Sequence, residues 1–331
     1  MEPGLVLITG ASGFVGGQLC PLLRMTGYKV RGTYFRRIPP PNSAAEMDWI
    51  HIPSIGANTD WAECLADGVT HVVHLAAVAH RIATDTEVPD SVYDAVNNLG
   101  TAQLAKAVAR TPSVRRFLFV SSIGAICNIS EATVDESTPC CPSTAYGKSK
   151  LAAEESVRSA LNNTPVEWCI LRCPLLYGPD NPGNMKRLLR LMELGVPLPL
   201  GSVNNRRSLL YVGNLIDAIR IALEHPNVAR NLYCLSDGID ISTTDLLRKL
   251  SEAAERGSLL FPFPKLGLRV LGKISDIIGR AAGQSLPTNS KAIEKLCGSL
   301  TVNGTRFRRD CAWRPPFTID QGLRATVIEP R

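Results

Sequence analysis

The sequence of 331 residues predicts an α/β fold, a doubly wound parallel sheet with a smaller C-terminal substrate-binding domain. Over the first 175 residues, short apolar runs rich in β-branched residues alternate with helical patterns, as in parallel sheets that helices cover on both faces. A glycine-rich turn joins the first strand to the first helix. Beyond Pro174 the chain is richer in prolines and turn-forming residues, which indicates a second, less regular unit.

The predicted elements follow one another in a regular order. An apolar strand at residues 4–10 leads into a helix at 14–27, and a second strand follows at 28–35. The next elements repeat this alternation, with strands at 69–77, 114–122 and 166–174 and helices at 92–111 and 145–161. The stretch "LLYVGNLIDAIRIALEH" at 209–225 then reads as a strand and a helix that return to the sheet domain.

Composition and charge are those of an ordinary globular protein, with 45% apolar and 20% charged residues. The formal net charge of +6 suits anionic small molecules, and no dense basic tract indicates a nucleic-acid partner. No apolar run approaches the roughly 20 residues that span a bilayer, so no integral membrane segment is expected. The apolar, basic stretch at 258–283 could touch a membrane surface, although packing on the core is the favoured interpretation.

Ten cysteines are scattered along the chain without a CxxC pair, and none of them has the spacing of a metal site. Several lie in apolar strand-like runs, where cysteine behaves as a small hydrophobe. No signal peptide precedes the first strand. We therefore expect reduced thiols, a cytoplasmic protein and no bound metal.

The glycine-rich turn "TGASGFVG" predicts where a cofactor binds. Gly10, Gly13 and Gly16 stand between a strand and the opening of a helix. Glycines permit a tight turn and close backbone approach, and the helix N-terminus attracts a pyrophosphate. The context therefore predicts a Rossmann-type dinucleotide site, to which Phe14 and Val15 of the same turn also belong.

The end of the second strand indicates which dinucleotide is preferred. An acidic residue there would bind the ribose 2′-hydroxyl of NAD, while a basic residue accommodates the 2′-phosphate of NADP. The run "VRGTYFRR" offers no acid and ends in Arg36 and Arg37. NADP(H) is therefore the expected cofactor. NAD(H) is the alternative, in which case the two arginines are solvated surface residues.

The stretch "AYGKSK" places Tyr146 four residues before Lys150 and two residues before Lys148. On a helix only Lys150 lies on the same face as Tyr146, one turn away. A cation held there would favour the phenolate and lower the pKa of the tyrosine from its usual value of about 10. Taken alone, the pattern also fits a surface helix with scattered lysines.

The GxxGxxG spacing and the Tyr146-x-x-x-Lys150 pair together resemble the extended branch of the short-chain dehydrogenase/reductase superfamily, which includes NAD-dependent epimerases and dehydratases. Three further motifs are similar to that branch in the same order, namely "HLAA" at 74–77, "NNLGT" at 97–101 and "RCPLLYGP" at 172–179. The resemblance covers nearly the whole chain. It implies further cofactor contacts from Leu75, Ala76, Ala77, Asn97 and Pro174.

The same resemblance implies the catalytic residues. Tyr146 is expected to act as acid in reduction and as base in oxidation, and Lys150 to serve both the phenol and the nicotinamide ribose. Ser122 completes the set as a donor to the negative charge that develops on the substrate oxygen, while Ser121 is expected to be buried and structural. Asn97 resembles a helix asparagine that supports the lysine through water, and a packing residue is the alternative.

Two positions depart from the pattern of the superfamily. Dehydratases carry an Asp-Glu pair after the catalytic hydroxyl residue, where this chain has Ile123 and Gly124, so dehydration is not expected. Members also often carry an aspartate at the adenine pocket, where Ser54 and Ile55 stand. Ile55 is therefore the residue expected beside the adenine.

The stretch "VPLPLGSVNNRRS" resembles members that bind nucleotide sugars. The resemblance implies that Leu200 lies at the uracil, that Arg207 grips the diphosphate and that Asn184 contacts the substrate. A guanidinium suits phosphate because it donates in a planar, bidentate fork. A solvated turn is the alternative for Arg207 and its neighbour Arg206.

The chain is thus expected to divide into two parts by function. Residues 1–175, with the return segment 207–235, form the dinucleotide-binding domain. Residues 176–206 and 236–331 form the nucleotide-sugar-binding domain. The resemblance also implies a possible homodimer.

The subgroup that the chain resembles most is described as UDP-glucose 4-epimerases, and its better-defined relatives reduce UDP-4-keto-6-deoxy-N-acetylglucosamine for lipopolysaccharide synthesis. We therefore expect an NAD(P)H-dependent reductase of the C4 ketone of a UDP-4-keto-6-deoxy-hexosamine or its dTDP analogue. A UDP-hexose 4-epimerase with tightly bound NAD is the first alternative. A hydroxysteroid-type dehydrogenase of the same branch and a non-catalytic subunit rank below it.

Overall fold

The computed structural model describes residues 4–36, 47–79, 88–182, 185, 189–190, 192, 195–255, 260–281 and 289–328. The chain forms a seven-stranded sheet in the order β3-β2-β1-β4-β5-β6-β9, in which every neighbouring pair is parallel. The strands are β1 (Leu5–Thr9), β2 (Lys29–Tyr34), β3 (Asp48–His51), β4 (Val69–His74), β5 (Arg116–Ser122), β6 (Glu167–Cys173) and β9 (Asn231–Cys234). Successive strands are added toward one edge of the sheet from β1 to β3 and toward the other edge from β4 onward. The point where this order reverses, between β1 and β4, is where ligands bind in doubly wound sheets.

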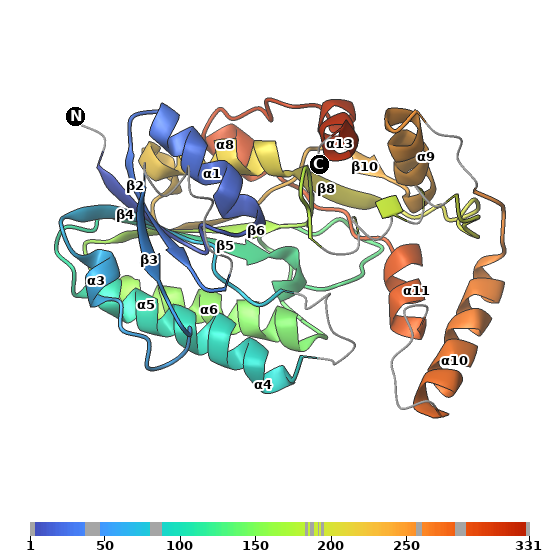
Figure 1. Ribbon diagram of the computed structural model, residues 1–331, viewed down its shortest axis with the longest axis horizontal. Coiled ribbons are helices and arrows are strands. Elements are labelled where there is room, and N and C mark those ends of the chain that lie inside the picture. The colour runs from blue at the N-terminus through green and yellow to red at the C-terminus, as the bar shows by residue number, and fades with distance from the viewer. Residues whose placement is uncertain are drawn as a thin grey trace.

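Helices cover both faces of this sheet (Figure 1). One face carries α1 (Phe14–Met25) and α8 (Val212–Glu224), and the other carries α5 (Gly100–Ala109) and α6 (Ala145–Leu161). Shorter helical segments are α3 (Ala62–Leu65), α4 (Asp90–Tyr93), η1 (Asp94–Leu99), η2 (Ile123–Ala125) and η3 (Pro226–Val228). The predicted fold class, a doubly wound parallel sheet, is confirmed.

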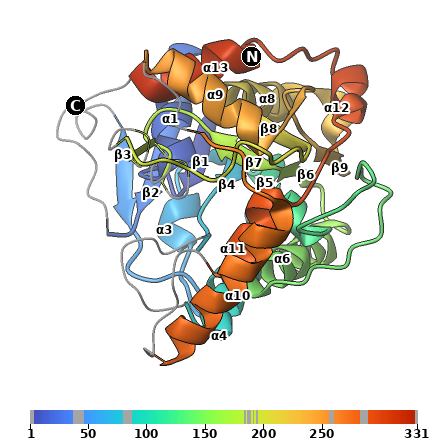
Figure 2. The same cartoon turned by 90° about the vertical axis from the view of Figure 1, so that its right-hand side faces the viewer.

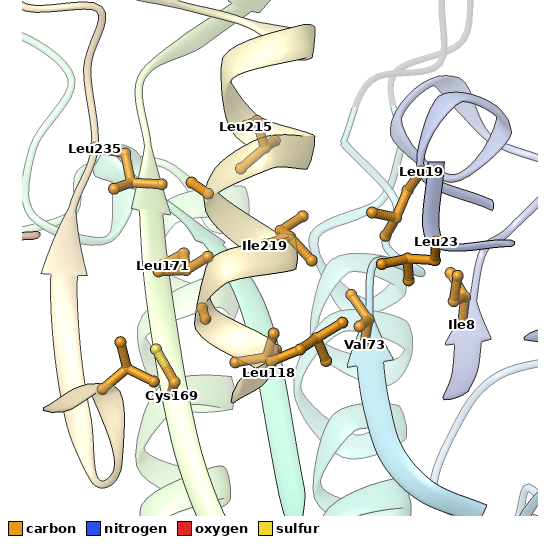
Figure 3. Packing of buried hydrophobic residues seen from close by; sticks show 14 of the residues in the cluster. Ile8, Leu19, Leu23, Val73, Leu118, Cys169, Leu171, Leu215, Ile219 and Leu235 are labelled. Atoms are coloured by element: carbon orange, nitrogen blue, oxygen red, sulfur yellow. The ribbon is translucent and has the colours of Figure 1, made fainter. Parts of the chain in front are cut away.

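The two layers of helices bury apolar side chains from opposite sides of each strand. Ile8 of β1 packs in a cluster with Leu19 of α1 and Ile219 of α8, as Figure 3 shows. The preceding residue, Leu7, belongs to a second cluster that includes Leu104 of α5. Strands buried on both faces are continuous apolar runs, which is why the sequence predicts them well.

A second sheet has three strands in the order β10-β8-β7. They are β7 (Leu175–Tyr177), β8 (Arg207–Tyr211) and β10 (Asp240–Ile241). The expectation that the strand of this segment returns to the large sheet is therefore wrong for β8, which pairs with β7 and β10. The helix α8 does pack on the large sheet and β9 joins its edge. A short apolar run does not indicate which sheet the strand will join, because β-propensity measures how well side chains fit a buried surface and not which strand they pair with.

The C-terminal part contributes five helices to the described structure: α9 (Thr243–Ala253), α10 (Lys265–Ala281), α11 (Ser290–Cys297), α12 (Thr305–Asp310) and α13 (Ile319–Ile328). α9 packs with α13, and α10 packs with α11 at one edge of the molecule (Figures 1 and 2). Across the described ranges, no helix has both the length and the apolar character needed to cross a bilayer.

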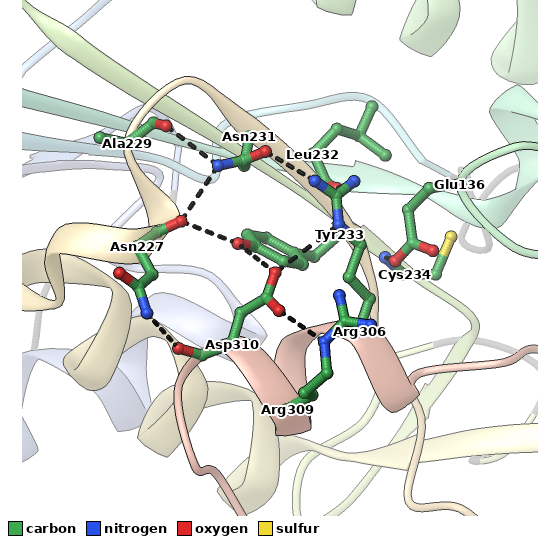
Figure 4. A network of polar contacts seen from close by, with 10 residues as sticks. All are labelled: Glu136, Asn227, Ala229, Asn231, Leu232, Tyr233, Cys234, Arg306, Arg309 and Asp310. Atoms are coloured by element: carbon green, nitrogen blue, oxygen red, sulfur yellow. Dashed lines mark hydrogen bonds and ion pairs between the residues drawn. The ribbon is translucent and has the colours of Figure 1, made fainter.

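Helix α12 closes the free edge of the large sheet at β9 (Figure 4). The Tyr233 hydroxyl donates to the Asn227 carbonyl at 3.0 Å and lies 3.2 Å from the Asp310 carboxylate. The Arg306 guanidinium donates to the side chain of Asn231 at 2.7 Å. These contacts tie α12 to a strand whose edge would otherwise be open to another chain.

Candidate active site

The glycine turn approaches the end of β4 so closely that side chains would not fit between them. Gly10 has a φ of +70°, and a Cβ at this position would lie 3.0 Å from the main chain of Ala76. A Cβ on Gly16 would lie 2.5 Å from the carbonyl oxygen of Gly10. Gly13 is the N-cap of α1. The turn, the start of α1 and the end of β4 thus form a main-chain cradle that fits a pyrophosphate.

The residues next to this cradle are held by the end of β1. The Leu75 N–H donates to the Thr9 carbonyl at 3.2 Å, and the Ala76 N–H donates to the Thr9 hydroxyl at 3.3 Å. Phe14 and Val15 open α1 and pack partly buried against a neighbouring apolar cluster. These predicted cofactor residues therefore lie together around the carboxyl ends of β1 and β4.

The end of β2 carries no carboxylate within residues 34–36. The Thr33 hydroxyl accepts from the Gly10 N–H at 3.2 Å, which fixes β2 beside the glycine turn. The Arg36 guanidinium lies 4.9 Å from the centre of the Phe35 ring, and both side chains are exposed. Arg37 lies outside the described residues. Arg36 therefore presents a positive charge just beyond the strand that borders the turn.

Three further predicted cofactor residues occupy loops at the carboxyl ends of the strands or beside them. Ile55 packs against α5, where a Cβ on Gly100 would lie 2.4 Å from its side chain. Ala77 lies in the loop that follows β4. Pro174 is buried and follows β6 directly. Ala77 and Pro174 thus share the edge of the sheet that bears the glycine turn.

Ser122 and Tyr146 meet where β5 ends and α6 begins. The Ser122 hydroxyl is hydrogen-bonded to the Tyr146 phenol. Thr144 caps α6, and its hydroxyl accepts a main-chain N–H of the first turn at 3.1 Å. The ring of Tyr93 packs edge-on against Tyr146, with the ring centroids 6.2 Å apart. The cap and this ring contact fix the phenol beside the serine.

Lys150 lies on the same face of α6, one turn beyond Tyr146, and is only 3% exposed. Its ammonium donates to the Val120 carbonyl at 2.8 Å and lies 4.3 Å from the centre of the Phe119 ring. Lys148, two residues earlier, is exposed. The helix therefore turns Lys150 inward and Lys148 to solvent, as the spacing predicts.

Burial decides the pKa values of the tyrosine and the lysine. It raises the pKa of Tyr146 to about 12, against the lowering effect of the hydrogen bond from Ser122. The expectation that Lys150 lowers the pKa of Tyr146 is therefore not met, because the ammonium is directed at Val120 and Phe119. Burial also lowers the pKa of Lys150 to about 8, and the Glu154 carboxylate opposes this shift.

Asn97 connects the loop after β4 with the helix that bears the lysine. It is buried in η1, a π-helical turn of the kind that often marks functional sites. Its side-chain amide exchanges hydrogen bonds of 2.8 and 2.9 Å with the main chain of Val78 and donates to the Ser149 hydroxyl at 3.0 Å. Asn97 therefore positions the residue that precedes Lys150.

A buried ion pair behind the lysine was not expected from the sequence. The Arg172 guanidinium contacts both oxygens of Glu154 at 2.6 to 3.2 Å. The Ser121 hydroxyl donates to the same carboxylate at 2.5 Å, and Ser121 is buried, as predicted. The signal for Glu154 was its position four residues after Lys150, on the same helix face.

A buried histidine also supports the lysine and was not expected from the sequence. His74 Nδ1 lies 2.6 Å from the Thr9 hydroxyl, and Nε2 lies 2.8 Å from the Thr101 hydroxyl. Burial lowers the pKa of His74 to about 3, so the ring is neutral. It stacks on Phe119, with ring centroids 5.5 Å apart, and Phe119 in turn faces the Lys150 ammonium.

The two adjacent arginines at the start of β8 have different surroundings. Arg206 is exposed and forms an ion pair with Asp240 at 2.8 Å. The Arg207 guanidinium donates to the carbonyls of Lys295 and Gly298 at 2.6 and 3.1 Å. Burial lowers the pKa of Arg207, and no carboxylate of the described residues forms an ion pair with it. Arg207 is therefore a desolvated cation held by main-chain carbonyls.

The other two residues predicted to contact the substrate are Leu200 and Asn184, and the structure describes only Leu200. Leu200 is buried in a cluster with Leu247 and Leu268, so its side chain packs inward. Its carbonyl accepts from the Thr244 hydroxyl at 2.6 Å. Asn184 lies outside the described residues.

Comparison with known proteins identifies a family and several proteins of similar sequence. Residues 6–233 match the family described as "NAD dependent epimerase/dehydratase family". A Vibrio cholerae protein named UDP-glucose 4-epimerase is 31% identical, and the alignment covers 98% of this chain and 95% of the relative. An Escherichia coli O157:H7 protein named N-acetyl-alpha-D-glucosaminyl-diphospho-ditrans,octacis-undecaprenol 4-epimerase is 28% identical, with coverage of 97% and 94%.

Solved structures share the fold at lower identity. The crystal structure of UDP-glucuronic acid 4-epimerase from Bacillus cereus, in complex with UDP-glucuronic acid and NAD, superimposes with a TM-score of 0.75. The two sequences are 22% identical, and the superposition covers 98% of each chain. The fold that this chain shares with that protein therefore includes the described part beyond the large sheet.

Proposed function

Because the chain belongs to the NAD dependent epimerase/dehydratase family, we propose that it transfers hydride between NADP(H) and C4 of a nucleotide-linked hexose. Its residues suit the reduction of a UDP-4-keto-6-deoxy-hexosamine, as used in surface polysaccharide synthesis. The observation that carries this proposal is the hydrogen bond between Ser122 and Tyr146, beside the buried Lys150 ammonium. A donor pair and a fixed cation on neighbouring elements are what carbonyl reduction requires.

The dinucleotide would lie over the glycine turn and the end of β4, at the carboxyl ends of the strands. A Cβ at Gly10 would meet the main chain of Ala76 and a Cβ at Gly16 would meet the Gly10 carbonyl, so glycine at both positions keeps the turn tight, and the start of α1 suits a pyrophosphate. Arg36 would pair with a 2′-phosphate, since the described end of β2 offers no acid for a 2′-hydroxyl. When bound, the nicotinamide supplies the hydride.

Side chains of the protein would stabilise the charge on the substrate oxygen and supply the proton. Negative charge grows on the carbonyl oxygen as a ketone is reduced, and the Ser122 and Tyr146 hydroxyls would donate to it. Tyr146 would then give up its proton. A pKa of about 12 keeps the phenol protonated near neutral pH, as the acid of a reduction must be. Lys150 would hold the ribose beside the phenol.

The residues next to Ser122 and Tyr146 disfavour a dehydration reaction. Ile123 is buried in an apolar cluster and has no group that transfers a proton. Gly124 faces the pair, because a Cβ there would lie 3.3 Å from the Ser122 hydroxyl and 3.9 Å from the Tyr146 ring. A side chain at position 124 would therefore reach the reacting groups, and glycine leaves that position without an acid.

The nucleotide sugar would lie on the other side of the site. We assign residues 1–175 with 207–235 to the dinucleotide and residues 176–206 with 236–331 to the sugar nucleotide. Arg207 opens β8 at the boundary between the two parts, and it would bind the diphosphate of the sugar nucleotide, because a desolvated guanidinium gains most from a bidentate diphosphate. UDP is the expected carrier, with dTDP as the second choice.

A 4-epimerase is the second candidate, and the Vibrio cholerae relative carries that name. The same serine, tyrosine and lysine would serve it. An epimerase would hold NAD tightly, and the described end of β2, residues 34–36, offers no carboxylate to the ribose 2′-hydroxyl of NAD. For this reason we rank reduction first.

Two assays on the purified full-length chain test the proposal. Thermal shifts with UDP-sugars and dTDP-sugars report which nucleotide binds. Turnover of UDP-4-keto-6-deoxy-N-acetylglucosamine with NADPH and with NADH reports reduction, and we expect the higher kcat/KM with NADPH. Interconversion of UDP-glucose and UDP-galactose without added cofactor would instead identify an epimerase. Equal or better use of NADH would refute the assignment of Arg36.

A further inference from the structure

Helix α10 turns its most apolar face away from the protein. Six large apolar side chains of this helix, between 43% and 73% exposed, are Leu266, Val270, Leu271, Ile274, Ile277 and Ile278. At about 100° per residue they form one continuous stripe that spans roughly 140° of the helix surface. In a globular protein such a stripe normally faces the core. We refer to these six residues as the apolar stripe.

The opposite face of α10 is the one that packs on the protein. Leu268 is buried in a cluster with Ile293 of α11. Gly272 approaches α11 so closely that a Cβ would lie 3.0 Å from the main chain of Ser290. The Asp276 carboxylate accepts from the Ser290 N–H at 3.2 Å. The expected packing of this segment on the core therefore holds for one face only, and the described residues leave the apolar stripe uncovered.

A row of positive charge runs beside the apolar stripe. Lys265, Arg269 and Lys273 are spaced by four residues, so they lie above one another on the helix, and all three are exposed. Asp276 is the one acid in the sequence of α10, and its carboxylate is directed at α11. The outward surface of α10 is therefore apolar and cationic at the same time.

The helix lies at the right-hand edge of the molecule in Figure 1 and on the side that faces the viewer in Figure 2. The segment that precedes α10 contacts the stretch that is expected to lie at the uracil. Leu260 pairs with Leu198, and the Gly201 N–H donates to the Phe261 carbonyl at 3.0 Å. Phe261 is itself 41% exposed. The apolar surface thus begins beside the proposed substrate segment and continues outward along α10.

We propose that α10 docks the protein on an anionic phospholipid bilayer, with the helix parallel to the membrane surface. An amphipathic helix with a basic flank binds such a surface through apolar burial and attraction to anionic lipid headgroups. A second copy of the chain is a poorer occupant, because two such helices would bring like charges at Lys265, Arg269 and Lys273 together. Membrane docking goes beyond the proposed oxidoreductase activity and does not depend on it.

Flotation of the purified full-length chain with lipid vesicles tests this proposal. Vesicles of equal parts phosphatidylethanolamine and phosphatidylglycerol should carry the protein upward in a density gradient, and phosphatidylcholine vesicles should not. Ile274→Ser combined with Ile277→Ser should lower the bound fraction by about tenfold or more, because apolar burial is lost. Arg269→Glu combined with Lys273→Glu should weaken binding by at least about fivefold for each charge removed.

Matched controls lie elsewhere on the surface. Met25→Ser removes an apolar side chain that is 85% exposed on α1, and Lys29→Glu reverses an exposed charge at the start of β2. Both should float like the wild type. All variants should keep the melting temperature and the turnover of soluble substrate.

Three outcomes would overturn the proposal. The wild type could fail to float with the anionic vesicles. Flotation could survive both double variants unchanged. Light scattering could reveal a dimer that the double serine variant dissociates, without any flotation, and the apolar stripe would then be an interface between two copies of the chain.

Discussion

Arg172 and Glu154 form a buried ion pair one helical turn beyond Lys150. Both side chains are at most 3% exposed, and the guanidinium contacts both carboxylate oxygens. The pair connects β6 to α6, so it holds the helix that carries the tyrosine and the lysine against the sheet. Removing one partner would leave an uncompensated charge in the interior.

Glu154→Ala should therefore lower the free energy of unfolding by about 3–5 kcal/mol. Urea titration followed by circular dichroism measures this change. Glu155→Ala alters the exposed neighbour on the same helix and should stay within about 0.5 kcal/mol of the wild type. Similar losses in the two variants would show that the ion pair contributes nothing specific.

The pH dependence of kcat/KM should report Lys150. Burial lowers its pKa from 10.5 to about 8, so the ammonium is present below about pH 8 and is lost as the pH rises. The rate of reduction should therefore fall about tenfold per pH unit on the alkaline side of pH 8. The Tyr146 phenol, with a pKa of about 12, stays protonated throughout this range.

Two variants check this assignment of the alkaline limb. Lys148→Ala should keep the limb where it is, since that side chain is exposed. A conservative Glu154→Gln should move the limb to lower pH, because the Glu154 carboxylate raises the pKa of Lys150. A rate that stays constant up to pH 10 in the wild type would refute the assignment.

Three variants on α6 separate proton transfer from cofactor binding. Tyr146→Phe keeps the ring and removes the donor, so kcat should fall by about 10²–10⁴ while the Kd of NADPH changes little. Lys150→Ala should lower kcat and weaken NADPH binding together. Lys148→Ala should change neither, and a larger effect there than at Lys150 would contradict the proposed site.

Gly16 and Gly17 are adjacent residues of α1 with opposite surroundings. A Cβ on Gly16 would lie 2.5 Å from the Gly10 carbonyl, whereas a Cβ on Gly17 would meet nothing within 4 Å. Gly16→Ala should displace the turn and abolish NADPH binding in calorimetry. Gly17→Ala should preserve binding and raise the free energy of unfolding by up to about 1 kcal/mol, since alanine is the better helix former. Equal binding by the two variants would refute the cradle.

Local chemistry made the sheet and the glycine turn predictable from the sequence. Buried parallel strands are continuous apolar runs, and the turn needs glycine because Gly10 adopts a positive φ against Ala76. The spacing of Tyr146 and Lys150 likewise indicates one helix face. Each of these features depends on residues that are close in sequence.

Features that depend on distant partners were not predictable in the same way. β8 joined the small sheet because β7 and β10 lie beside it, which its own five residues do not encode. Glu154 and Arg172 are 18 residues apart and meet only once α6 packs on β6. The pKa of Tyr146 was expected to fall, but burial raised it, and burial is a property of the whole fold.

The measurement that tests the central claim most directly is the stoichiometry of NADPH oxidation with UDP-4-keto-6-deoxy-N-acetylglucosamine. We predict that the wild type consumes one NADPH for each 4-hydroxy sugar formed, as followed by the absorbance of the reduced nicotinamide and by NMR of the product. Tyr146→Phe should consume almost none under the same conditions. A wild-type protein that interconverts C4 epimers of a UDP-hexose, leaves the 4-keto sugar untouched and consumes no NADPH would contradict the account.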